Sequence, residues 1–285
     1  MNYQHWLAYA ANKLCHSDSA KRDAEILLQY ITGKTRTFLI AFGETELTVK
    51  QQQQLEHLLA RRAMGEPIAY LVEEKEFWSL PMKVSPVTLI PRADTECLVE
   101  RALQLLPEKQ AVKILDLGTG TGAVALALAS EYPRAQIVGI DISDAAITLA
   151  QLNANNLVIN NVQFCKSNWF TSLPIQQFDM IVSNPPYIDE CDPHVQQGDV
   201  RFEPKTALIS ANHGLADIQL IIEQSRNYLA NKGWLLLEHG WLQGRQVRQL
   251  FSCHHYQQVV TFQDYGGNDR ITVGQWKCDE NHSCF

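Results

Sequence analysis

The chain has 285 residues, 46% hydrophobic and 19% charged, so it is long and apolar enough to bury a full core and to divide into two domains. Its formal net charge is −7, which argues against the broad basic face that duplex-binding proteins present to phosphates. Residues 1–72 carry eight Lys/Arg and seven Asp/Glu, or +1, which leaves −8 for residues 73–285. We therefore expect no direct nucleic-acid partner.

The cysteine usage and the lack of long apolar runs predict a cytoplasmic protein. Seven cysteines are scattered without a C-x-x-C pair, which is typical of a reducing environment. The first 15 residues lack the basic and then apolar pattern of a signal peptide, and the longest apolar run, AVALALA at 123–129, is too short to span a membrane. We expect a soluble, cytoplasmic monomer without a membrane partner.

The first part of the chain is predicted to be helical. Apolar residues repeat at helical spacing over 6–14 and 24–31. Thr48 and Gln51 form a capping-box pattern ahead of a further helix with apolar residues at 55–59. Residues 1–73 are therefore predicted to form a small all-helical domain, and the alternating pattern at 74–90 predicts a hairpin linker.

Strand and helix patterns alternate through the third predicted domain, residues 91–285. The predicted strands are 112–117, 136–141, 162–167, 178–183, 233–238, 257–262 and 270–276, with helices at 122–132, 143–156 and 214–230. This alternation predicts an α/β fold with a doubly wound, mostly parallel seven-stranded sheet. The short glycine-rich turn at 263–269 predicts that the last strand is antiparallel.

A glycine-rich loop, DLGTGTGA at 116–123, follows the first of these strands. Its glycines let the backbone approach a ligand and turn into a helix whose N-terminus favours electron-rich groups. Asp141 ends the second strand, where its carboxylate can accept both hydroxyls of a ribose. The candidate cofactor-binding residues in this region are Gly118, Thr119, Gly120, Thr121, Gly122 and Asp141.

The nature of the cofactor depends on the residue before the first glycine. Gly118, Gly120 and Ala123 also satisfy the dinucleotide pattern G-x-G-x-x-[GA]. Asp116 favours a different ligand, because a carboxylate here would repel a pyrophosphate but suits the cationic amine of S-adenosylmethionine. A plain turn that binds no cofactor is the alternative, and the position of Asp141 argues against it.

The segment FDMIVSNPPYID at 178–189 ends a buried strand in a rigid corner. Two prolines remove two N–H donors, which leaves the Pro185 carbonyl as a fixed acceptor beside the Asn184 amide oxygen. Tyr187 offers a flat face for stacking. These features suit a conjugated NH2 group whose nitrogen is aimed at a sulfonium methyl. The candidate catalytic residues are therefore Asn184, Pro185 and Tyr187. The candidate substrate-binding residues are the same three together with Pro186.

The residues on which these predictions rest also carry a resemblance to the release factor glutamine methyltransferase family. The matching segments are GEPIAY (65–70), IPRADTE (90–96), DLGTGTG (116–122), GID (139–141), NWF (168–170), NPPYI (184–188) and RFEPKTAL (201–208). The resemblance implies methyl transfer from S-adenosylmethionine to the side-chain amide of the glutamine in the Gly-Gly-Gln loop of bacterial peptide chain release factors. It also implies that the helical domain helps to dock the release factor.

The resemblance assigns roles to individual residues. It implies that Gly118 to Gly122 and Asp141 bind the cofactor, that Trp169 packs on its adenine, and that Asn184 to Tyr187 hold the glutamine, with Asn184 also counted among the cofactor contacts. Asn168 stands where family members often have Asp, which predicts a weaker or altered cofactor affinity.

Several other polar residues have two interpretations. Arg92, Asp94 and Glu96 could border the pocket, although Asp94 could equally be a helix N-cap. Arg201 and Glu203 could brace the loop above the corner or form a surface ion pair. His239 is predicted to be structural, and the tail 277–285, with Cys278, His282 and Cys284, is predicted to be disordered rather than a metal site.

Three alternative functions use part of the same pattern. A DNA adenine methyltransferase would share the NPPY corner but would need a basic groove for base flipping. A methyltransferase for another protein's glutamine, such as one in a ribosomal protein, would use the same corner. A non-catalytic nucleotide-binding module would keep the glycine loop without needing Asn184 and Tyr187.

Overall fold

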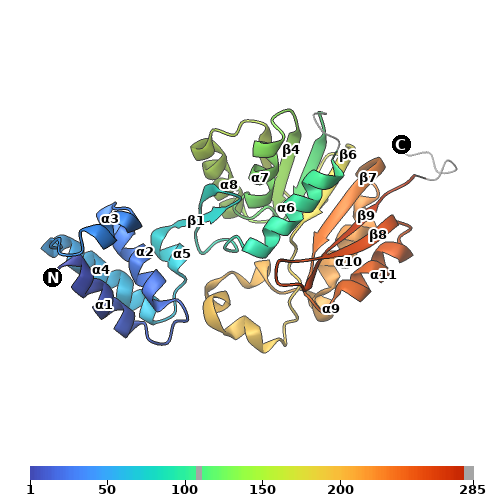
Figure 1. Ribbon diagram of the computed structural model, residues 1–285. Coiled ribbons are helices and arrows are strands. Elements are labelled where there is room, and N and C mark those ends of the chain that lie inside the picture. Colours follow the sequence, from blue (N-terminus) through green and yellow to red (C-terminus); the bar gives the residue numbers. More distant parts are fainter. Residues whose placement is uncertain (107–110, 279–285) are drawn as a thin grey trace. The chain divides into compact units, whose positions relative to one another are not determined.

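The computed structural model describes residues 1–106 and 111–278 (Figure 1). By its internal contacts the chain divides into two compact units. A helical unit contains residues 1–74 together with 196–202, and a sheet unit contains 75–195 and the described residues from 203 onward. The predicted boundaries, 1–73, 74–90 and 91–285, gave no indication of the returning segment 196–202, which the sequence places within the third domain.

The helical unit contains α1 (Tyr3–Lys13), α2 (Ala20–Thr32), α3 (Arg36–Ala41), α4 (Val49–Ala63) and α5 (Ile68–Val72). Its helices pack on a cluster in which Trp6, Leu27 and Leu55 are completely buried or nearly so. The predicted capping box is confirmed at the start of α4, because the Thr48 hydroxyl accepts from the Gln51 amide and the Gln51 side chain accepts from the Thr48 amide. The returning segment adds the short helical turn η2 (Gly198–Phe202) to this unit.

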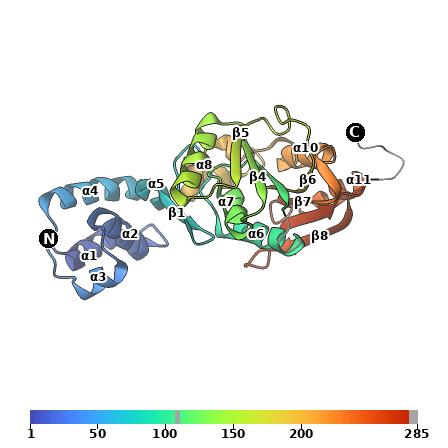
Figure 2. The ribbon, with the colours of Figure 1, turned by 90° about the horizontal axis from the view of Figure 1, so that it is seen from above.

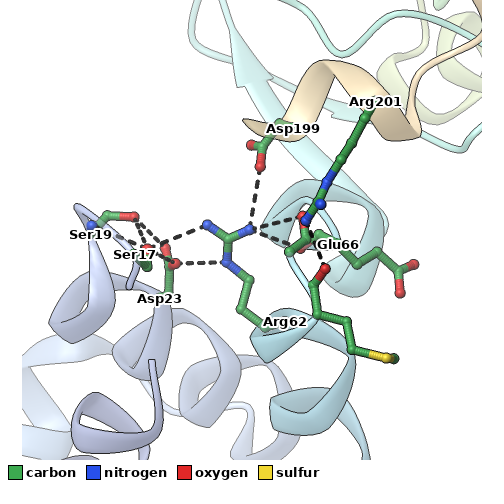
Figure 3. Close-up of polar contacts among 9 residues, drawn as sticks. Ser17, Ser19, Asp23, Arg62, Glu66, Asp199 and Arg201 are labelled. Carbon is green, nitrogen blue, oxygen red and sulfur yellow. Dashed lines mark hydrogen bonds and ion pairs between the residues drawn. The ribbon is translucent and has the colours of Figure 1, made fainter. Parts of the chain in front are cut away.

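Arg62, near the end of α4, joins distant stretches of the helical unit (Figure 3). Its guanidinium donates to the Asp23 carboxylate on α2 at 2.8 Å and to Asp199 in the returning segment at 3.3 Å. Arg201, two residues further along that segment, donates to the Met64 carbonyl at 2.8 Å. The Asp23 and Arg62 side chains are only 3% and 11% exposed, so this ion pair is buried. The hydrogen bonds from Arg62 to Asp199 and from Arg201 to Met64 hold the returning segment against the helices.

The remaining elements follow in chain order. They are β1 (Glu74–Phe77), β2 (Leu80–Lys83), α6 (Ala93–Leu105), β3 (Lys113–Leu117), α7 (Ala123–Glu131), β4 (Gln136–Asp141), α8 (Asp144–Leu157), β5 (Val162–Lys166), β6 (Phe178–Ser183), η1 (Pro193–Gln196), η3 (Lys205–Ala207), α9 (Ala211–Gly214), α10 (Ala216–Ser225), β7 (Leu229–Glu238), α11 (Gly244–Cys253), β8 (Gln257–Gln263) and β9 (Asp269–Gln275). Strands β1 and β2 form a separate two-stranded sheet at 74–83.

The main sheet has the strand order β5-β4-β3-β6-β7-β9-β8. The first five strands in this order, β5, β4, β3, β6 and β7, are parallel to one another, while β9 runs antiparallel to both β7 and β8. The predicted doubly wound, mostly parallel seven-stranded sheet is therefore confirmed. The predicted helix at 214–230 is too long, because α10 ends at Ser225 and β7 already begins at Leu229. Helix α11 was not predicted from the sequence.

Both faces of the sheet are covered by helices (Figure 2). On β6, Met180 and Val182 join the cluster that contains residues of α6 and α7, whereas Ile181 joins the cluster that contains residues of α10 and α11. Because side chains alternate along a strand, a strand buried on both sides has consecutive apolar residues, as Met180, Ile181 and Val182 are in β6. No helix within the described residues is long and apolar enough to cross a membrane.

We expect Arg62→Met to destabilise the helical unit by about 3 kcal/mol, because breaking a buried ion pair leaves the Asp23 carboxylate without its cation. Ser17 and Ser19 still donate to Asp23, which keeps the expected loss near the lower end of the range for such pairs. Hydrogen exchange of the α2 and α4 amides measures the effect. Arg22→Met is the matched control, because the Arg22 side chain is 57% exposed in its pair with Glu25 and such pairs contribute less than about 1 kcal/mol. Equal protection losses in the two variants would mean that the buried pair contributes no more than the exposed one.

Candidate active site

The candidate site forms where the strand order reverses between β3 and β6. These strands are parallel neighbours, with Leu117 paired to Ser183 at their carboxyl ends. The buried Ser183 hydroxyl donates to the Leu117 carbonyl at 2.7 Å. Gly118 and Asn184, which come next in the chain, therefore leave the sheet side by side, and ligands bind at this position in open α/β sheets.

A cavity of about 370 Å³ lies at this edge of the sheet, within the size range of small-molecule sites. The predicted site residues on its wall are Gly118, Thr119, Gly120, Thr121, Asp141, Trp169, Asn184 and Pro186. The structure does not place Gly122, Pro185 or Tyr187 on this wall. Gly122 instead begins α7 at φ 82°, where a Cβ would lie only 3.0 Å from the Phe164 ring.

The glycine loop is held against the end of β4 by Asp141. One carboxylate oxygen of Asp141 accepts from the Gly120 amide at 3.0 Å, and the other accepts from the Ser143 amide at 2.9 Å. Each oxygen has a further lone pair, so the same carboxylate can still receive donors from a ligand. Gly118 takes a left-handed conformation at φ 70°, which brings its backbone close to the Trp169 ring.

Asp116 is a buried carboxyl on the wall of the cavity. Burial raises its pKa to about 7, the nearby Asp141 charge acts in the same direction, and the hydrogen bond from Thr119 at 2.6 Å opposes both. A carboxyl in this position is poorly solvated when ionised, so a cationic group in the cavity would stabilise its charged form.

Trp169 lies beside the glycine loop in a left-handed conformation, at φ 48°. Its indole N–H donates to Asp217 at 3.1 Å, and its carbonyl accepts from the Ser167 hydroxyl at 2.7 Å. These contacts fix the ring next to the cavity. The neighbouring Asn168 also lines the cavity and is exposed.

The NPPY corner is held by side chains from other elements. The Asn184 amide group donates to the Thr95 hydroxyl at 3.2 Å, which leaves the Asn184 oxygen for another donor. The Tyr187 hydroxyl donates to Glu238 at 3.2 Å, burial raises the Tyr187 pKa, and the ring packs against the cluster below α10 and α11. Gln243 donates to the Tyr187 carbonyl at 3.0 Å, so the corner is rigid on both sides.

Arg92 and Glu203 brace one wall of the cavity. Arg92 lines the cavity and donates to the Glu203 carboxylate at 2.5 Å, and Glu203 also accepts from the Ile90 amide at 3.1 Å. Because Glu203 is 5% exposed, the alternative of a surface ion pair is wrong for this residue. Arg201 does not join this brace, since it donates to Met64 in the helical unit.

The other polar candidates, Asp94, Glu96 and His239, do not line the cavity. The N-cap interpretation of Asp94 is wrong, because α6 begins one residue earlier with Arg92 as its N-cap. Glu96 accepts from the Trp78 amide at 2.8 Å. His239 is buried, contacts the Thr272 hydroxyl at 2.8 Å, and has a pKa lowered by burial, which confirms its predicted structural role.

Thr95 and Glu238 are among the residues at the site that were not predicted from the sequence. Thr95 was overlooked within IPRADTE, although it contacts Asn184 directly. Glu238 ends the apolar run LLLE at the carboxyl end of β7, and it is 2% exposed. A carboxylate that ends a buried strand, as Asp141 does, was the available signal for Glu238. Among the described residues no group of three or more His, Cys, Asp or Glu could hold a metal, and the tail residues His282 and Cys284 lie outside them.

Known proteins resemble this chain along nearly its whole length. Residues 108–275 match the model of a methyltransferase domain, and residues 5–72 match the PrmC N-terminal domain. The release factor glutamine methyltransferase of Escherichia coli is 61% identical over 276 residues, covering 97% of this chain and 99% of that protein, and the Haemophilus influenzae protein of the same name is 50% identical over 97% and 100%. A methyltransferase structure from Pyrococcus furiosus shares the fold, with a TM-score of 0.54 and 15% identity over 81% of this chain and 100% of its own. The chain belongs to the release factor glutamine methyltransferase family.

Proposed function

We propose that this chain transfers a methyl group from S-adenosylmethionine to the side-chain amide nitrogen of the glutamine in the Gly-Gly-Gln loop of peptide chain release factors. The observation that carries the proposal is the placement of Asn184 and the glycine loop on one cavity. The relatives named release factor glutamine methyltransferase supply the substrate class.

The residues around the cavity fit S-adenosylmethionine. In this proposal the cofactor-binding residues are Gly118, Thr119, Gly120, Thr121, Asp141, Trp169 and Asn184, while Gly122, which does not line the cavity, forms the turn into α7. The left-handed glycines bring bare backbone to the cavity, Asp141 offers acceptors for ribose hydroxyls, and the fixed Trp169 ring offers a face for the adenine. Bound there, the cofactor would supply a methyl group carried on a positively charged sulfur. The buried Asp116 suits the cationic amine of the same molecule.

The proposed role of the NPPY corner is to hold the glutamine amide. The Asn184 oxygen, on the cavity wall, would accept one N–H of the amide group. The Pro185 carbonyl, which does not line the cavity in this structure, is the proposed acceptor of the other N–H, while Pro186 shapes the cavity wall and Tyr187 closes the corner. An amide nitrogen is a poor nucleophile because its lone pair is delocalised. Fixed acceptors favour attack by orienting the nitrogen and by stabilising the positive charge that develops on it.

We further propose that the helical unit docks the body of the release factor. This unit is formed from a segment that matches the PrmC N-terminal domain, carries almost no net charge, and exposes the large apolar side chains Ile40 and Phe42. Protein interfaces gain most of their energy from a few such anchors, whereas nucleic-acid interfaces need clustered positive charge.

We expect Asp141→Ala to weaken S-adenosylmethionine binding by about 1–3 kcal/mol, the usual cost of losing a charged hydrogen-bond partner. The change removes both the ribose acceptor and the carboxylate that holds the Gly120 amide. Calorimetric titration of the cofactor measures it. Asp144→Ala is the matched control, because this nearby carboxylate is 76% exposed and does not line the cavity. Unchanged affinity in Asp141→Ala would refute the assignment.

The affinity for S-adenosylmethionine is expected to rise with pH through about 7. Burial raises the Asp116 pKa in the free protein, so below that pH the carboxyl must lose a proton before it pairs with the cationic amine. Titrations in buffers of different ionisation enthalpy should show proton release on binding at pH 6, and this release should decline toward pH 7.5. Asp116→Asn should bind more weakly and lose this dependence. A proton release that is the same in Asp116→Asn would rule out Asp116 as the source.

We expect Asn184→Ala to lower turnover about 100- to 1,000-fold while the fold is largely kept, because the lost acceptor acts mainly on charge that develops in the transition state. Radiolabelled S-adenosylmethionine, incubated with release factor, ribosomal protein and duplex DNA, tests this variant and the proposed function together. Label should appear on the release factor and disappear when its Gly-Gly-Gln glutamine is replaced by alanine. Label on DNA or ribosomal protein instead would overturn the substrate assignment, and a short Gly-Gly-Gln peptide that matches the intact release factor would overturn the docking role.

A further inference from the structure

We propose that Thr95 and Glu238 are positioning residues that keep the Asn184 amide oxygen turned toward the substrate. This inference rests on the proposed function, in which that oxygen accepts an N–H of the glutamine amide. It adds two residues that act through Asn184 and Tyr187 rather than by contact with the reacting atoms.

The orientation of Asn184 depends on one hydrogen bond. An asparagine amide can be turned by half a rotation, which exchanges its acceptor oxygen for its donor NH2 group. Here the NH2 group donates to the Thr95 hydroxyl at 3.2 Å, so the oxygen is the group left for the substrate. Thr95 lies in the first turn of α6, is 5% exposed, and lines the cavity together with Asn184.

The Thr95 hydroxyl keeps this orientation only if its own hydrogen points elsewhere. A hydroxyl has one hydrogen, and a hydroxyl that donates to Asn184 would hold the amide in the opposite orientation. In the proposal the buried Glu238 carboxyl takes that hydrogen, since Thr95 lies close enough to Glu238 to favour its charged form and lower its pKa. Among the described residues Glu238 Oε2 has no hydrogen-bond partner, so this buried acceptor is the one that the proposal assigns to the Thr95 hydroxyl.

Glu238 holds the second clamp residue as well. Its Oε1 atom accepts from the Tyr187 hydroxyl at 3.2 Å. One carboxylate at the end of β7 thus holds Tyr187 directly and lies near Thr95, the partner of Asn184, so it is close to both ends of the NPPY corner, which itself follows β6. Because β6 and β7 are paired through Ser183 and Leu237, the carboxylate and the corner are held in fixed register.

The charge on Glu238 decides which way these hydrogen bonds run. An ionised carboxylate only accepts, so in the proposal Thr95 donates to it and accepts from Asn184. A protonated Glu238 can donate to Thr95, whose hydrogen is then free to turn toward Asn184 and allow the inactive orientation. The charged groups that face Glu238 are Arg270 on β9, which favours ionisation, and Asp94 on α6, which opposes it, while burial has the largest influence and raises the pKa to about 7.

The test compares Thr95→Val with Thr95→Ser at saturating S-adenosylmethionine. Valine keeps the shape of threonine without the hydroxyl, and serine keeps the hydroxyl. We expect kcat on release factor to fall about 100-fold in Thr95→Val, the scale of a misplaced reacting group, and to be restored most of the way in Thr95→Ser. Cofactor affinity, measured by calorimetry, should be similar in both. Thr95→Ala replaces the valine variant if the latter does not fold.

The dependence of kcat on pH distinguishes the proposed role of Glu238 from a role in packing alone, because packing does not depend on the titration of Glu238. In the wild-type chain kcat should fall as the pH drops through about 7, where Glu238 takes up a proton. Saturating cofactor keeps Asp116 ionised and so removes its contribution. Glu238→Gln should lower kcat and abolish this step, since glutamine does not titrate.

The results separate this inference from the proposed function. Equal impairment of Thr95→Val and Thr95→Ser, or an unchanged kcat in Thr95→Val beside an inactive Asn184→Ala, would overturn the positioning role and leave the clamp intact. A pH step retained in Glu238→Gln would likewise overturn the role of Glu238. Normal turnover of Asn184→Ala would overturn the acceptor role itself, and the positioning role with it.

Discussion

The site depends on the parallel pairing of β3 with β6. The crossovers that follow these strands leave in opposite directions along the sheet, so the loops after them separate and leave a cavity between them. The register pairs Leu117 with Ser183, and the buried Ser183 hydroxyl bonds to the Leu117 carbonyl at the last residue before each loop. A shift of one residue in the register between β3 and β6 would displace Gly118 and Asn184 relative to each other along the strand direction. It would also move the side chains of one strand to the opposite face of the sheet.

Supporting contacts then fix each loop from outside its own strand. Asp141 holds the glycine loop from β4, Thr95 holds Asn184 from α6, and Glu238 holds Tyr187 from β7. Each of these side chains stands at the same edge of the sheet as the loop that it contacts. A site with rigid acceptors therefore needs no long-range motion to assemble, because the sheet itself sets the positions of the groups that orient it.

The main features of the fold and the candidate site could be predicted from the sequence because they depend on local patterns. The apolar runs specify the strands, the three glycines specify the loop, and NPPY specifies a rigid corner. The returning segment 196–202 could not be predicted, since its place depends on Arg62 reaching Asp199 across 137 residues of sequence. Thr95 was missed for the same reason: nothing in IPRADTE indicates that Asn184 lies beside it. Helix α11 was overlooked although Val247 and Phe251 form an apolar pair at helical spacing.

Two buried carboxyls at the site lower the stability of the free protein at neutral pH. Burial raises the pKa of Asp116 and of Glu238 to about 7, so between their ordinary values and pH 7 the folded chain binds more protons than the unfolded chain. Folding stability from these groups therefore falls as pH rises through that window. The two carboxyls differ in which groups stabilise their charged form.

For Glu238 the offset is built into the fold, because Tyr187, Thr95 and Arg270 all favour its charged form. For Asp116 the Thr119 hydroxyl is one offset within the protein, and Asp141 acts against it. A cationic ligand would therefore stabilise ionised Asp116 more than ionised Glu238. Two carboxyls with similar pKa values in the free protein are thus expected to separate once the cavity is filled, Asp116 becoming fully ionised and Glu238 keeping its titration near neutral pH. The ionisation of Asp116 would then depend on whether the cofactor is bound. The ionisation of Glu238 would depend on its contacts with Tyr187, Thr95 and Arg270.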